Sequence, residues 1–226
     1  MKNIRIRIKF LDPILGMSPS NQDLYMDYIA SKNPDPQFDP SDELESIPAE
    51  EGSTITIFPR TREGDPCFFD YQIRGFFKES CAMLARSNGL DETGKKSKKK
   101  AVTLSGKETA YKKLVDGNIF VYPRKIPIMY DGEMSLCQRP LRASTPQGER
   151  ITLACSEEIP EGAVIEFDVK IMRDTDVDLL AEWMTYGEYH GMGQWRNSGK
   201  GRFLVEKFIV TDIKDGLKPK FEIQYA

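Results

Sequence analysis

The chain has 226 residues, of which 39% are hydrophobic and 30% are charged, and its formal net charge is −3. This length is enough for one large domain or two small ones with a substantial core. No stretch approaches the roughly 18 consecutive apolar residues of a membrane-spanning helix. The N-terminal residues alternate charge with isoleucine instead of forming the apolar core of a signal peptide. We therefore expect a cytoplasmic protein without a membrane partner.

Cysteine and histidine usage argues against a metal site. The four cysteines form no C-x-x-C pair, and the chain has one histidine, whereas zinc sites need clustered ligands of these types. We expect the thiols to be reduced and buried. The sequence contains no Walker phosphate loop and no nucleophile elbow, and we predict neither a cofactor nor a metal.

Charge is unevenly distributed along the chain. Residues 13–52 contain nine acids and one lysine, a local balance of −8, whereas residues 88–125 contain ten Lys or Arg and four acids, a balance of +6. Such segregation predicts separate surfaces with separate partners, or one surface of a subunit docking on the other surface of its neighbour. We expect the second arrangement, in which copies assemble head to tail.

The first half of the chain contains a strand and a long helix. Isoleucine alternates with charged residues from Lys2 to Phe10, which predicts a strand with one buried face. Residues 31–52 are rich in proline and acids, which favours an exposed loop. After a short strand at 54–58, a helix is expected from Asp70 to the glycine at position 89, with its apolar residues on one face.

The middle of the chain is basic and then strand-like. A run of lysines at 95–100 is too like-charged to fold on its own and predicts a loop. Ser105 with Glu108 matches a capping box for a helix that ends near Asp116. Short strands are expected at 119–122 and 126–130.

The last third predicts a hairpin, a helix and a strand. Residues 150–156 and 163–172 are strand-like and separated by a turn with proline and glycine, which favours an antiparallel hairpin. Thr175 is expected to cap a helix that ends before Gly187, and 203–212 is a strand. The order is strand, helix, strand, strand, helix, strand, an α+β, ferredoxin-like (RRM-like) βαββαβ core in a single domain, 1–226. Two large insertions interrupt it, an acidic one at about 13–68 and another at about 88–149 with the basic loop and small strands.

A glycine-rich segment lies between the last helix and the last strand. Residues 191–202 hold four glycines, three cations and one tryptophan. Glycine permits positive φ and close backbone approach, the cations can contact phosphates, and a tryptophan can stack on a base. The alternative is a glycine-rich turn whose tryptophan packs into the core. We predict a nucleic-acid-binding loop made of Gly191, Gly193, Trp195, Arg196, Asn197, Ser198, Gly199, Lys200, Gly201 and Arg202.

The element order and this loop resemble the RAMP superfamily of CRISPR-associated proteins. Members combine a ferredoxin-like unit with a glycine-rich loop between its last helix and last strand. The spacing of Gly191, Gly193, Gly199 and Gly201 is similar to the family's G-x-G-x-x-x-x-x-G-x-G loop. The sequence Ile-Arg-Gly-Phe-Phe-Lys at 73–78 also resembles the start of the first helix in the subunits that form the CRISPR effector backbone.

The resemblance implies a non-catalytic protein of antiviral defence that binds guide RNA, or another single-stranded nucleic acid, beside other CRISPR effector subunits. Several copies would line up along the strand, and each would insert a loop that kinks it. Arg74 and Lys78 would flank the groove formed by the glycine-rich loop. The reaching loop would be the basic one, with Lys95, Lys96, Lys98, Lys99 and Lys100.

Two other functions stay open at this point. Some RAMP proteins are metal-independent ribonucleases that process guide precursors with a histidine, for which His190 is the candidate here. Certain backbone subunits cut target RNA with a loop aspartate, for which Asp23 and Asp27 are the candidates. The chain can also be a CRISPR-subunit mimic or a protein-interaction module from a phage or other mobile element, with the acidic segment as its active surface.

Overall fold

The computed structural model describes residues 1–21, 55–87, 103–108, 110–145 and 148–214, and it is a mixed α+β structure, as predicted. Its centre is a four-stranded sheet in the order β11-β1-β10-β6. The strands are β1 (Lys2–Phe10), β6 (Ile119–Tyr122), β10 (Val164–Ile171) and β11 (Phe203–Asp212). Every neighbouring pair is antiparallel.

The strand β1 confirms the prediction from its alternating sequence. Ile4, Ile6 and Ile8 are completely buried, whereas Arg5 and Lys9 on the other face are exposed. This is the pattern of a strand that packs one face on a core and turns the other outward. β1 lies in the middle of the sheet, between β10 and β11.

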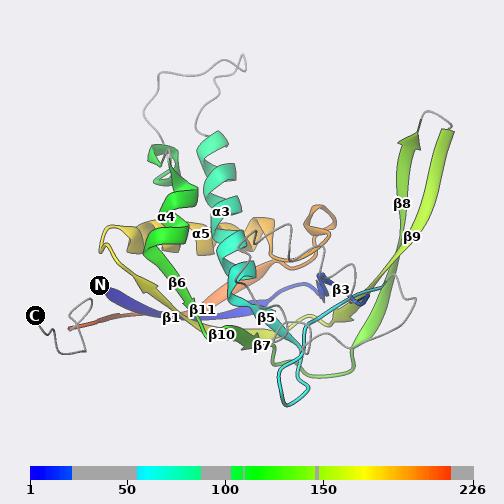
Figure 1. The fold of residues 1–226 in the computed structure, drawn as a ribbon, viewed down its shortest axis with the longest axis horizontal. Helices are drawn as coiled ribbons and strands as arrows, with labels where there is room; N and C mark the ends of the chain where they lie inside the picture. The colour runs from blue at the N-terminus through cyan, green and yellow to red at the C-terminus, as the bar shows by residue number, and fades with distance from the viewer. Residues whose placement is uncertain (22–54, 88–102, 109, 146–147, 215–226) are drawn as a thin grey trace, which may run out of the picture.

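Three helices pack on one face of this sheet (Figure 1). They are α3 (Asp70–Ser87), α4 (Tyr111–Asn118) and α5 (Asp176–His190). The core between helices and sheet is aromatic: Phe77 of α3 stacks on Trp183 of α5 with ring centroids 5.8 Å apart. The predicted helix that begins at Asp70 and the one after Thr175 are confirmed, and they connect β1 to the β6 region and β10 to β11. The expected end of the second helix before Gly187 is wrong, because Gly187 is buried inside α5, which continues to His190.

Two predicted helix caps are wrong. Ser105 lies in a short 3-10 turn (Ser105–Lys107), its hydroxyl donates to Glu182 at 2.5 Å, and it accepts the Trp183 indole N–H at 2.9 Å. Thr175 precedes α5 without a side-chain capping hydrogen bond. At Ser105 the Glu182 carboxylate offers a stronger bond than a helix amide, since a carboxylate accepts a shorter, charge-assisted hydrogen bond.

The predicted hairpin of 150–156 with 163–172 is also wrong. The strand β9 (Gly148–Ile159) pairs along its length with β8 (Ser135–Thr145), whereas β10 pairs with β1 and β6. β8 contains Pro140 and many polar residues, so its sequence gives a weak strand signal. The second strand of the central sheet is therefore β6, which the prediction had placed inside an insertion.

The remaining strands are short and attach to the base of this long hairpin. A second sheet has the order β2-β9-β4-β3, with β8 paired to β9. Its short strands are β2 (Ile14–Leu15), β3 (Ser18–Pro19) and β4 (Ile55–Ile57), and a separate pair joins β5 (Cys67–Phe69) to β7 (Lys125–Pro127). The outer part of the β8–β9 hairpin projects well away from the body of the molecule (Figure 1).

Candidate nucleic-acid interface

The glycine-rich loop is closed by a narrow neck at its two ends. The Met192 amide donates to the Gly201 carbonyl at 2.8 Å, and both Gly191 and Gly201 have a φ of 76°. A Cβ atom added to Gly201 would lie 1.9 Å from the Met192 carbonyl oxygen. These two positions therefore require glycine, because the chains at the neck are too close for a side chain and φ is positive.

The neck is also tied to the segment that follows β1. The Gly201 amide donates to the Pro13 carbonyl at 3.1 Å, and the Leu11 amide donates to the Arg202 carbonyl at 2.7 Å. Met192 is buried in the core cluster. The loop is therefore a fixed part of the fold at one end of the central sheet.

Each of the three cations in the loop has a carboxylate partner. Arg196 contacts Glu79 of α3, Lys200 contacts Glu158 of β9 at 2.7 Å, and Arg202 contacts Asp12 at 2.7 Å. Since the pairs reach α3, β9 and the segment after β1, they hold the loop against three parts of the fold. The cations predicted to bind phosphate thus also fix the shape of the loop.

Glu79 also holds His190, the residue considered as a catalytic histidine. His190 Nε2 lies 3.3 Å from Glu79 Oε1, and the imidazole ring stacks on Tyr186 with centroids 5.0 Å apart. Partial burial raises the pKa of Glu79, but the hydrogen bonds and charges of Arg196 and His190 outweigh it, so this pKa lies below its usual value. The arrangement shows His190 as a packing and hydrogen-bonding residue at the end of α5.

Trp195 is an exposed large hydrophobic residue of the loop, and it contacts Arg139 of the projecting hairpin. Trp195 is 37% exposed and has a left-handed backbone with a φ of 57°. The Arg139 guanidinium of β8 lies over its ring, 5.1 Å from the centroid, and Arg139 Nη2 donates to the Gln194 amide oxygen at 2.8 Å. The sequence analysis missed Arg139, because nothing around it distinguishes it from any other arginine in a strand.

Of the remaining candidates from the sequence, the two on α3 do not lie at this loop. Lys78 contacts Asp116 of α4 at 2.5 Å, and Arg74 contacts Asp70 within α3 at 3.0 Å. Neighbouring positions on a helix point about 100° apart, which is why Glu79 reaches the loop and Lys78 does not. Asp23, Asp27 and the lysines at 95–100 lie outside the described residues. Asn197 and Ser198 are exposed in a short 3-10 turn of the loop.

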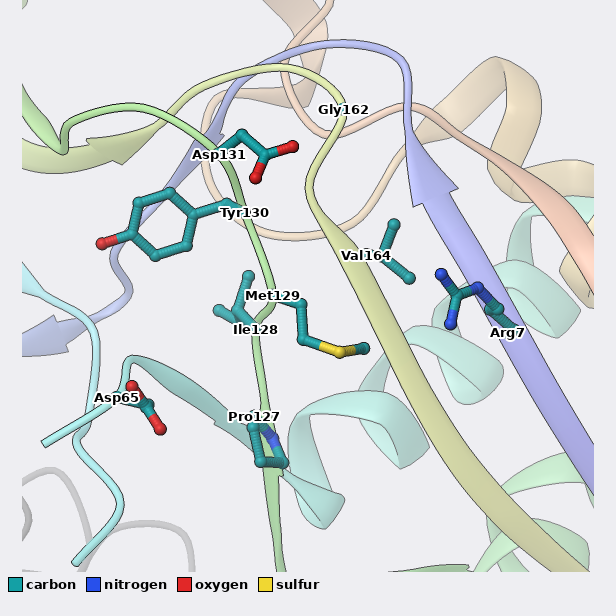
Figure 2. A pocket seen from close by; sticks show the side chains of 9 residues that line it. All are labelled: Arg7, Asp65, Pro127, Ile128, Met129, Tyr130, Asp131, Gly162 and Val164. Atoms are coloured by element: carbon teal, nitrogen blue, oxygen red, sulfur yellow. The ribbon is translucent and has the colours of Figure 1, made fainter. Parts of the chain in front are cut away.

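A surface cleft of about 410 Å³ lies beside the base of the hairpin (Figure 2). Met129 and Val164 form apolar parts of its wall, and Arg7, Asp65 and Asp131 contribute charge. Arg7 is paired with Glu206 at 2.9 Å and with Glu166 at 3.5 Å. The lining residues of the cleft include no histidine, cysteine or serine, so it offers no nucleophile of those types.

Comparisons with known proteins do not name the site, since neither a family model nor a curated protein matches the chain. Within the part of the chain that the structure describes, no group of three or more His, Cys, Asp or Glu side chains could hold a metal ion. The described helices include none with the length and apolar character needed to cross a membrane.

Proposed function

We propose that the protein has a ferredoxin-like βαββαβ core and binds single-stranded RNA without cleaving it, in the manner of a CRISPR effector backbone subunit. The strand order β11-β1-β10-β6, with all pairs antiparallel, supports the core. In this order the glycine-rich loop joins the last helix, α5, to the last strand, β11. The RNA would lie across this end of the molecule.

The observation that carries the proposal is the meeting of the loop with the projecting hairpin. Pairing places Leu136, Pro140, Ile151 and Leu153 on one face of the hairpin, because residues paired across an antiparallel ladder share a face and alternate ones follow them. Leu136, Ile151 and Leu153 are 57%, 65% and 56% exposed. Apolar side chains on a projecting element are suited to wedge between bases and unstack them. Trp195, near the hairpin base, offers a ring on which a base can stack.

This proposal changes which element reaches into the RNA. From the sequence we expected the basic loop at 95–100 to insert into the RNA strand. This loop lies outside the described residues. The β8–β9 hairpin has the length, the projection and the exposed apolar side chains that such an element needs (Figure 1). We therefore assign the reaching role to the hairpin and leave the lysines a role in screening phosphates.

The open face of the central sheet is the other surface on which RRM-like proteins bind RNA. In this protein the arginines on the open face of the sheet are paired with carboxylates. Arg5 contacts Asp168 at 3.1 Å, and Arg7 contacts Glu166 and Glu206. These carboxylates lie in the same plane as the cations and would repel a phosphate backbone. The loop and hairpin are therefore favoured over the sheet face.

Titration of labelled single-stranded RNA, followed by fluorescence anisotropy, tests the proposal. We expect binding that weakens between roughly 50 and 200 mM salt, because phosphate contacts release counterions. Duplex DNA of equal length is the control and should bind more weakly, since its bases cannot stack on Trp195. The same RNA incubated in EDTA should stay intact, and cleavage that disappears in His190→Ala would instead establish the ribonuclease. Failure to bind any single-stranded RNA at low salt would refute the proposal.

A further inference from the structure

Arg139 is the one cation at the loop that lacks a carboxylate partner in the described structure. Its Nη2 donates to the neutral amide oxygen of Gln194, whereas Nε and Nη1 are buried without any hydrogen-bond acceptor. A guanidinium ion binds an oxyanion through two neighbouring nitrogens, either Nε with Nη2 or Nη1 with Nη2. Each of these two pairs in Arg139 has one unsatisfied nitrogen.

An unsatisfied buried donor on a charged group is costly, because it has lost its hydrogen bonds to water and gained none in the protein. The cost is reduced when an anion with two oxygens replaces the single amide oxygen of Gln194, because either Nε or Nη1 then gains an acceptor while Nη2 keeps one. The loop cations gain less from a phosphate, because Arg196, Lys200 and Arg202 would each have to leave a carboxylate. Among these four cations, Arg139 is therefore the one with most to gain from an incoming phosphate.

Gln194 and Trp195 together cover the Arg139 guanidinium. Gln194 is neutral and accepts a single hydrogen bond from the guanidinium. The Trp195 ring, which is 37% exposed, packs on the guanidinium. Trp195 has the left-handed backbone that side chains rarely adopt, and it is the only such residue other than glycine in the described part of the chain. Residues with this kind of backbone strain cluster at ligand-binding sites and switch regions.

We propose that Arg139 and Trp195 form a binding site for one nucleotide of the RNA strand. A phosphate takes the place of the Gln194 oxygen on the guanidinium, and the attached base stacks on the Trp195 ring. The inference rests on the proposed function, and it adds the position and chemistry of one contact. The site lies where the glycine-rich loop meets the base of β8, on the hairpin face opposite Leu136 and Leu153.

Tryptophan emission gives a direct test in the unmodified protein. Of the two tryptophans, Trp183 is fully buried and Trp195 is exposed, so a stacked base quenches Trp195 alone. We expect single-stranded oligouridine RNA to quench the emission of the wild type on binding, and to leave the emission of Trp195→Phe unchanged while that variant still binds. Trp195→Ala should bind about tenfold more weakly, as expected for the loss of one stacked base.

The arginine is tested by Arg139→Gln, with Lys207→Gln on the open face of the sheet as a control for the same change of charge. Arg139→Gln should weaken RNA binding about tenfold and lower the salt slope by about one, and Lys207→Gln should change neither. RNA that binds without quenching Trp195 would overturn the site and leave the proposed function standing. A wild type that binds no RNA would overturn both. The quenching of Trp195 is measured in the wild type, so it tests the binding site even if Arg139→Gln is poorly folded.

Discussion

At the scale of single residues, the glycines of the loop differ in what they do. Gly201 lies at the neck, where a Cβ would meet the Met192 carbonyl, whereas Gly199 has a φ of 87° but no atom within 4 Å of its added Cβ. The first position is constrained by space and by φ, and the second by φ alone. The four-glycine spacing alone does not distinguish Gly199 from Gly201.

Substitution to alanine should separate these cases. Gly201→Ala should destabilise the protein by more than about 2 kcal/mol, since it combines a backbone clash with a positive φ. Gly199→Ala should cost about 1 kcal/mol. Denaturation with urea, followed by circular dichroism, measures the two differences. Equal losses would mean that the neck can widen.

Gly75 provides the matched control inside α3. It is exposed, its φ is not positive, and nothing lies within 4 Å of an added Cβ. Alanine is favoured over glycine within a helix by about 1 kcal/mol, so Gly75→Ala should raise the free energy of unfolding. A fall in stability would reveal a packing role for this glycine.

The pKa of Glu79 makes the neck region sensitive to acid. Because its pKa in the folded protein lies below the ordinary value of 4.5, the stability that it contributes is present above that value and is lost as the pH falls through the folded pKa. Glu79→Gln should therefore lower the melting temperature at neutral pH and flatten its decline below about pH 4.5. Melting curves of both proteins between pH 3 and 7 (roughly the range in which carboxyl groups titrate) provide the measurement. Parallel curves would show that other carboxyl groups control the acid response.

At the scale of elements, the β8–β9 hairpin can be shortened without disturbing the core. Pro140 pairs with Leu153, so replacing residues 141–152 with Asn-Gly closes the hairpin in register with a two-residue turn. The shortened protein keeps Arg139 and the pairing of β9 with β2 and β4. We expect a nearly unchanged melting temperature and a lower affinity for single-stranded RNA. An unchanged affinity would show that the hairpin is not the reaching element.

The sequence predicted the elements that are buried on one face, whereas in the projecting hairpin it predicted a strand within β9 but neither β8 nor the pairing of the two. β1, β11, α3 and α5 carry a periodic apolar pattern that follows from packing on the core. β8 carries no such pattern, because a hairpin in solvent needs no buried side. The loop was found from its glycines, yet its ion pairs and the contact of Trp195 with Arg139 could not be found, since they depend on residues distant in sequence. The contacts of Arg139 with Gln194 and Trp195 depend on the position of β8 beside the loop, which the sequence does not indicate.

At the scale of the whole molecule, we expect copies to assemble head to tail along RNA. The −8 balance of residues 13–52 and the +6 balance of residues 88–125 predict acidic and basic surfaces on opposite flanks of the subunit, and a two-fold contact through either flank would bring like charges together. They can pair with the next copy in a repeating contact. Residues 22–52 and 88–102 of these segments lie outside the described residues.

Light scattering with RNA of increasing length tests the assembly. The mass of the complex should grow in steps with RNA length and fall as salt rises, because contacts between exposed charges are screened over about 8 Å at physiological salt. The protein without RNA, at the same two salt concentrations, is the control. A single copy at every RNA length would exclude the head-to-tail arrangement.

The position of β1 in the middle of the sheet has a consequence for how the chain folds. Both of its neighbours come from the last third of the sequence, and Lys2 pairs with Asp212 at a separation of 210 residues. Contacts that close such long loops form slowly. During synthesis β1 therefore stays unpaired in the central sheet until β10 and β11 have been made. In that interval the apolar side of β1 can pair with other chains, so the protein should refold slowly and lose yield as its concentration rises.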